Sequence, residues 1–206
     1  MPATSGNDGP ARKAAKPAAT EEARLHRLDA RVITVPIESL SSLICHAWSD
    51  KAKKMMLDKQ TKAARTAKAA KNPEEDYRAS LYLIEEDVYG FPGIAFKKAM
   101  VRAAQYADAK MVFLRGAVFV LGDLVRIDGK PQMREDMVRL PGGVADLRYR
   151  AEFPEWRADL KIQYNDKALS AEQIINYLSI AGFSVGVGEW RPEKDGEHGR
   201  FKVVAG

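Results

Sequence analysis

The chain has 206 residues, 46% of them apolar and 30% charged, with a net charge of +5, so we expect a folded domain with a real hydrophobic core. No apolar run approaches the roughly 18 residues of a membrane-spanning helix, and the first residues lack the apolar centre of a signal peptide. The single cysteine, Cys45, excludes an internal disulfide and a cysteine-rich zinc site. These features predict a protein of a reducing cytoplasm without membrane contact.

The N-terminal part of the chain divides into a tail and a first strand. Residues 1–28 are rich in Ala, Pro, Gly, Lys and Glu and predict a disordered tail. The segment RVITVPIESL, at 31–40, is dominated by strand-forming residues and predicts a strand, in which Pro36 indicates an edge or a strand end. The following SSLICHAWSD predicts a short extended piece or a turn.

The positive charge is concentrated after this strand. Residues 51–71 contain eight Lys or Arg residues and one acidic residue, so the remainder of the chain has a net charge of −2. This stretch lacks Gly and Pro, and we expect a basic helical or flexible insertion at about 50–75. Lys51, Lys54, Lys62 and Arg65 are spaced so that they would lie on one face of a helix, which we call the basic face. The face is a solvated surface, a contact for nucleic-acid phosphates or a membrane-surface contact, and for the last Met55, Met56 and Leu57 offer a thin apolar wedge.

Strands and one helix are expected in the middle of the chain. The segment RASLYLIEEDVYGFPG, at 78–93, predicts a short strand pair. IAFKKAMVRAAQYA, at 94–107, predicts a helix with a broad apolar face, from which Lys97, Lys98 and Arg102 point away. Short strands are then expected in MVFLRGAVFVLG, DLVRIDGK and MVRLPGG.

The C-terminal part predicts two longer strands, a helix and a closing strand. The longer strands flank Pro154, and the second of them alternates apolar and polar residues, which indicates one buried face. In SAEQIINYLSIAG, Ser170 is the expected N-cap and Gly182 the expected C-cap of a helix. A glycine-rich loop and the strand GRFKVV complete the chain.

Without its insertions this order reads β-α-β-β-α-β. We therefore predict an α+β fold with a ferredoxin-like (RRM-like) core, a basic insertion and extra β-hairpins, forming a single domain over residues 29–206.

The glycine-rich loop does not match a nucleotide-binding motif. Gly186 and Gly188 follow a helix and precede a strand, whereas a dinucleotide loop follows a strand and precedes a helix. No Walker, zincin or nucleophile-elbow motif is present, and the three histidines are scattered. We expect no metal, no cofactor and no catalytic residue, which favours a non-enzymatic role and leaves an enzymatic one open.

The ending AGFSVGVGEWRPEKDGEHGRFKV resembles the RAMP superfamily, the RRM-like proteins of CRISPR effector complexes, in which a helix, a glycine-rich loop with an Arg, and a GRF strand follow one another. YGFPGIAFKKAMVRAA resembles the RAMP segment in which a Pro–Gly turn begins a basic helix, a region that contacts guide RNA in backbone-type members. The similarity extends from about Asp29 to the end of the chain. EWRPEKDGEH departs from the usual loop and is similar to small phage proteins, which implies a phage or prophage origin in a bacterial host cell.

The resemblance implies a nucleic-acid-binding surface, and the chemistry of the residues agrees with it. Glycines admit a phosphate close to the main chain, arginines bind phosphate oxygens with two hydrogen bonds, and an aromatic ring stacks on an unpaired base. Besides the basic face, the expected binding residues are Lys97, Lys98, Arg102, Arg148, Arg150, Gly186, Gly188, Trp190, Arg191 and Arg200. Trp190 is alternatively an anchor of the loop, and Arg191 is alternatively an ion-pair partner of Glu189 or Glu193.

Three classes of function are compatible with these residues. The first is a non-catalytic binder of single-stranded RNA or DNA that assembles as a homo-oligomer along the strand. The second is a RAMP-like endoribonuclease, for which His46 and His198 are the available general acids or bases. The third is a phage structural or interaction protein.

Overall fold

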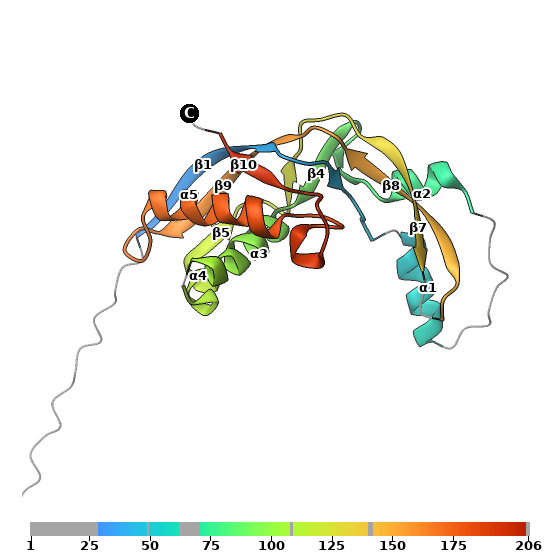
Figure 1. Ribbon diagram of the computed structural model, residues 1–206, viewed down its shortest axis with the longest axis horizontal. Coiled ribbons are helices and arrows are strands. Elements are labelled where there is room, and N and C mark those ends of the chain that lie inside the picture. Colours follow the sequence, from blue (N-terminus) through green and yellow to red (C-terminus); the bar gives the residue numbers. More distant parts are fainter. Residues whose placement is uncertain (1–28, 49, 62–70, 108, 140–141, 205–206) are drawn as a thin grey trace, which may run out of the picture.

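The computed structural model describes residues 29–48, 50–61, 71–107, 109–139 and 142–204. The predicted N-terminal tail lies outside these ranges. The described chain is a mixed α+β protein whose strands pair antiparallel in three sheets (Figure 1). None of the helices within these ranges is both long and apolar enough to cross a membrane.

The central sheet has four strands in the order β10-β1-β9-β5. Its longest pairing joins β1 (Ala30–Ser39) to β9 (Arg157–Asn165), in register from Ala30 opposite Asn165 to Glu38 opposite Arg157. The short strands β10 (Phe201–Val203) and β5 (Val118–Val120) form its two edges. The alternation predicted for the second of the longer strands is confirmed, because Ala158, Leu160, Ile162 and Tyr164 are all buried.

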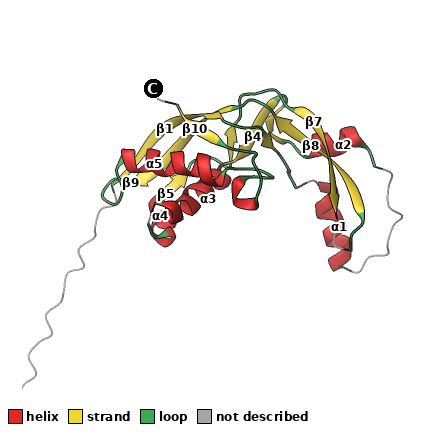
Figure 2. Cartoon of the chain, viewed as in Figure 1, coloured by secondary structure: helices red, strands yellow, loops and turns green. Residues whose placement is uncertain are grey.

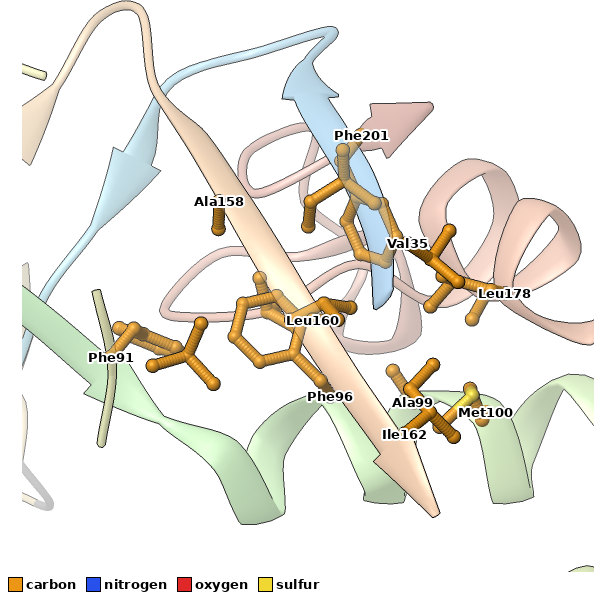
Figure 3. Packing of buried hydrophobic residues seen from close by; sticks show 14 of the residues in the cluster. Val35, Phe91, Phe96, Ala99, Met100, Ala158, Leu160, Ile162, Leu178 and Phe201 are labelled. Atoms are coloured by element: carbon orange, nitrogen blue, oxygen red, sulfur yellow. The ribbon is translucent and has the colours of Figure 1, made fainter. Parts of the chain in front are cut away.

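Helices α3 (Gly93–Ala103) and α5 (Ala171–Ile180) pack on the sheet. In Figure 3, Leu160 and Ile162 of β9 point toward Phe96, Ala99 and Met100 of α3. A capping box at Ser170 begins α5, as the sequence predicts, with the Gln173 main-chain N–H donating to the Ser170 hydroxyl. The helices therefore cover the apolar face of the sheet and contribute one side of the core.

An aromatic chain crosses this core. The ring of Phe96 meets those of Phe91 and Phe201 edge-on, each at a centroid distance of 6.0 Å, and Phe201 meets Trp156 in the same way. All four side chains are buried. Edge-to-face packing of this kind stabilises a core beyond simple burial, and it ties α3, β10 and the start of β9 together.

Two smaller sheets flank the central one. The first contains β2 (Leu43–Ile44), β8 (Ala145–Phe153) and β7 (Gln132–Arg139), and the second contains β3 (Tyr82–Glu85), β4 (Val88–Pro92) and β6 (Leu124–Arg126). The β7–β8 hairpin, with α1 (Asp50–Gln60) and α2 (Pro73–Ala79), lies at the end of the molecule away from α3, α4 (Met111–Ala117) and α5 (Figure 2). Helix α1 accounts for the first part of the predicted basic insertion.

The predicted strand MVFLRGAVFVLG is wrong in its first half. Met111–Ala117 form helix α4, and only Val118–Val120 form a strand. Leu114 and Ala117 lie three residues apart and are both buried, and Leu114 packs in a small cluster with Val101 of α3. A short apolar run fits a strand and a buried helix equally well, so the packing against α3 decides the outcome.

Two predictions about residues expected to end a helix or to mark a sheet edge also need correction. Gly182 does not cap α5, because the chain continues through a π-helical turn, η2 (Ala181–Val185), and a Cβ at Gly182 would overlap the Phe201 carbonyl. Pro36 does not mark an edge strand, because β1 has partners on both sides. It does lie where the pairing with β10 ends, and its carbonyl accepts a hydrogen bond from Val204.

Phe96→Ala should lower the free energy of unfolding by about 3–5 kcal/mol, because it removes a fully buried ring and leaves a cavity beneath the sheet. Val112→Ala, at a side chain that is 75% exposed on α4, is the control and should change it by less than about 0.5 kcal/mol. Urea denaturation followed by circular dichroism measures both, and similar losses in the two variants would contradict this description of the core.

Candidate nucleic-acid interface

The glycine-rich loop leaves η2 through Gly186, whose φ of +69° lies in the left-handed region. The Gly186 N–H donates to the Ala181 carbonyl at 2.8 Å and so closes the π-helical turn. Further on, the Val187 N–H donates to the Gly199 carbonyl, and the Gly199 N–H donates to the Ser42 carbonyl at 2.7 Å. The loop is therefore folded back on itself and attached to the segment before β2.

Gly188 brings the loop into direct contact with β2. Its φ is +82°, and a Cβ placed on it would lie 2.7 Å from the Ile44 carbonyl oxygen and 2.8 Å from a methyl carbon of Leu43. The next residue, Glu189, donates its N–H to the same Ile44 carbonyl at 3.1 Å. Gly188 thus satisfies two demands that only glycine meets here, a left-handed backbone and the close approach of two main chains.

A cleft of about 240 Å³ lies between α3, the β2 region and this loop. Lys98 and Ile94 of α3 line it on one side, His46 lines it beyond β2, and Gly186, Gly188 and Arg191 line it from the loop. Four of the residues predicted from sequence are therefore brought together, namely Lys98, Gly186, Gly188 and Arg191. Lys98 is exposed, so its ammonium group is accessible to a ligand.

Glu193 holds two arginines at this cleft. The Nε and Nη2 atoms of Arg191 donate to Oε2 of Glu193 at 3.0 and 2.9 Å, and Nη1 donates to the Gly188 carbonyl at 3.0 Å. Arg102 of α3 pairs with the other carboxylate oxygen of Glu193 at 3.0 Å. The ion pair that the sequence allowed for Arg191 is thus present, and one carboxylate serves two guanidinium groups.

A histidine–carboxylate pair also lines the cleft. Nδ1 of His46 lies 3.4 Å from Oε1 of Glu189, and both side chains are a little under half exposed. The hydrogen bond from His46 lowers the pKa of Glu189, although partial burial opposes the shift. Glu189 therefore contributes negative charge to the same cleft as Lys98 and Arg191.

Other predicted binding residues lie outside the cleft. Lys97 sits over the ring of Phe119, its Nζ 3.9 Å from the centroid, and burial lowers its pKa. On the β7–β8 hairpin, Arg148 pairs with Asp146 at 3.1 Å, and Arg150 is buried 3.6 Å from Asp136.

The basic face is described only in part. Lys54 is exposed on α1. The side chain of Lys51 and the residues Lys62 and Arg65 lie outside the described part of the chain.

Trp190 and Arg200 are not among the residues that line the cleft. Trp190 is 46% exposed and has a φ of +54°, which is rare for a bulky residue, and its carbonyl accepts a hydrogen bond from His198. The guanidinium carbon of Arg200 lies 4.8 Å from the centroid of the Phe183 ring. Both residues present polar or aromatic surface to solvent.

Sequence reasoning missed several partners of these residues. The sequence shows His198 only as one of three scattered histidines, but its Nδ1 lies 2.8 Å from the Ser42 hydroxyl, which donates to Glu152 at 2.7 Å. Ser42 is 110 residues from Glu152 and 156 from His198, so no local spacing could have indicated this relay. The pairing of Arg102 with Glu193 and the ring beneath Arg200 were missed for the same reason.

No protein-family model matches the chain, and neither does any curated protein. Among solved structures, the chain is similar to the crystal structure of Cmr6 from Pyrococcus furiosus, with 14% sequence identity and a TM-score of 0.47, over 86% of this chain and 100% of that chain. A likeness at this level assigns neither a fold family nor a site residue.

Gly188→Ala should destabilise the fold by about 1–3 kcal/mol, because the new Cβ requires a left-handed backbone and pushes against the Ile44 carbonyl. Gly116→Ala is the matched control, since a Cβ at this position in α4 meets no atom within 4 Å, and it should leave stability unchanged or slightly raised. Chemical denaturation compares the two, and equal stabilities would show that the loop tolerates a looser contact with β2.

Proposed function

We propose that this protein is a non-catalytic binder of single-stranded RNA or DNA with a RAMP-like, ferredoxin-type core. The observation that carries the proposal is the cleft in which Lys98 of α3 faces Gly186, Gly188 and Arg191 of the glycine-rich loop. A cleft with cations on two sides and main chain at its wall suits a phosphate backbone.

The arrangement of the central sheet supports the fold part of the proposal. Helix α3 lies in sequence between β1 and β5, α5 lies between β9 and β10, and the sheet order is β10-β1-β9-β5. In a β-α-β-β-α-β unit this is the order fourth, first, third, second, which a ferredoxin-like sheet has. Together with the loop and GRF strand at the end of the chain, this order favours the RAMP-like interpretation over an unrelated α+β fold.

The choice of a single strand follows from the shape and chemistry of the surface. The cleft is too small to admit a duplex, and the exposed Trp190 beside Arg191 offers a ring on which an unpaired base can stack. The basic helix α1 adds sequence-independent attraction from the other end of the molecule. The sequence resemblance further implies a phage origin and a place in the bacterial cytoplasm. We include in the proposal that the protein assembles as a homo-oligomer along the nucleic-acid strand.

One pair of residues favours a second candidate, an endoribonuclease. His46 lies in the cleft and is oriented by Glu189, as a general acid or base often is. Incubation with labelled RNA followed by gel electrophoresis separates the two functions. Intact RNA supports the binder, and cleavage that His46→Ala abolishes supports the nuclease.

The double variant Lys98→Ala/Arg191→Ala should bind a labelled single-stranded oligonucleotide at least about tenfold more weakly, because two charge-assisted phosphate contacts are lost. The slope of log affinity against log salt should fall by about 0.7 for each contact. Arg78→Ala, which removes a 75%-exposed arginine on α2, is the control and should change neither quantity. Fluorescence anisotropy measures both, and wild-type affinity in the folded double variant would place the binding surface elsewhere.

Glu193→Gln should strengthen oligonucleotide binding several-fold and steepen its salt dependence, because the amide no longer neutralises Arg102 and Arg191. Glu74→Gln removes the carboxylate partner of Arg78 far from the cleft and should have no effect. Weaker binding by a folded Glu193→Gln variant would mean that the carboxylate positions Arg191 for the ligand rather than competing with it.

A further inference from the structure

A second aromatic–cation surface lies next to the cleft, on the π-helical turn η2. Phe183 is 63% exposed, although Gly182 and Val185 of the same turn are buried. The guanidinium group of Arg200 lies over one part of its ring, 4.8 Å from the centroid. Neither residue belongs to the cleft lining, so this pair is a separate feature of the surface.

Both residues are held by main-chain contacts. The turn that carries Phe183 is closed by the hydrogen bond from Gly186 to Ala181, and Gly182 packs against the Phe201 carbonyl. The N–H of Arg200 donates to the Ser41 hydroxyl at 3.0 Å, and its carbonyl accepts hydrogen bonds from the N–H groups of Leu40 and Ser41. The ring and the guanidinium group therefore project from fixed backbone, which reduces the entropy lost when a ligand binds them.

The charge of the pair selects the ligand. Within the described residues no carboxylate forms an ion pair with Arg200, in contrast to Arg191 and Arg102, which share Glu193. An uncompensated guanidinium repels cationic ligands and attracts flat π-systems and phosphates. A nucleotide has both of the favoured groups, a base that stacks on the ring or the guanidinium plane and a phosphate that Arg binds.

We propose that Phe183 and Arg200 form a stacking site for one unpaired nucleobase of the strand whose phosphates occupy the cleft. The inference rests on the proposed function and adds a contact for a base to those for the backbone. Phe183 is two residues from Val185, which lines the cleft, so their Cα atoms are at most about 8 Å apart. A single strand is long enough to contact both.

The test compares two single-stranded oligonucleotides of equal length, one with normal bases and one with an abasic sugar–phosphate backbone. The wild-type protein should bind the base-bearing oligonucleotide about tenfold more tightly. Phe183→Ala should reduce this preference, with the remainder due to stacking on Trp190, and should leave the abasic affinity and the salt slope unchanged, while Phe183→Trp retains the full preference. Phe113→Ala is the matched control, because Phe113 is 46% exposed on α4 and has no cation over its ring within the described residues.

A second measurement keeps the proposal testable if Phe183→Ala disturbs the fold. An oligonucleotide containing the fluorescent base 2-aminopurine should change its emission on binding wild-type protein, and Phe183→Leu, which keeps apolar bulk, should make this change smaller without abolishing binding. Equal wild-type affinity for the two oligonucleotides, or a preference that Phe183→Ala leaves unchanged, overturns the stacking site and leaves the phosphate contacts of the cleft intact. Failure of wild-type protein to bind either oligonucleotide overturns both proposals.

Discussion

The contact between main chains in the C-terminal loop is the constraint on which the rest of the structure depends. A Cβ at Gly182 would overlap the Phe201 carbonyl, and one at Gly199 would overlap the Val187 carbonyl. A Cβ at Gly188 would press on the Ile44 carbonyl. These approaches hold the loop against β10 and β2 and thereby define one wall of the cleft. Because glycine is the residue type without a Cβ, both the conformation of the loop and the wall of the cleft depend on glycine at these few positions.

The cleft contains positive and negative side chains close together, so their charges partly cancel. Lys98 and Arg191 face the same space as Glu189 and Glu193, so the net charge of the chain is not expressed there as an open positive patch. A phosphate that binds Arg191 would have to replace Glu193 as the partner of its guanidinium group. The loss of the existing ion pair reduces the net gain in binding affinity. Arg200, with an aromatic ring beneath it in place of a carboxylate, has no such exchange to make.

The β7–β8 hairpin uses its arginines differently. Arg134 pairs with Asp136 and Glu152, and burial of Glu152 is outweighed by hydrogen bonds from Ser42, Gln132 and Arg134, so the pKa of Glu152 is lowered. Arg150 is buried beside Asp136, and within the described residues its Nε and Nη1 atoms donate no hydrogen bond. Incomplete satisfaction of a buried ion pair costs stability, so the pairing of Arg150 with Asp136 does not by itself indicate a more stable hairpin.

Local pattern alone determined much of the architecture. The alternation of Ala158, Leu160 and Ile162, the cap at Ser170 and the apolar face of α3 each follow from backbone geometry within a few residues, and the sequence predicts them correctly. Tertiary packing decided the rest. The run MVFLRGA became a helix because Leu114 could be buried against α3, and Gly182 became a packing contact rather than a cap. The relation of Lys98 to Arg191, of Glu193 to Arg102 and of Phe183 to Arg200 depends on how distant segments lie on the sheet, and no periodicity in a sequence encodes such distances.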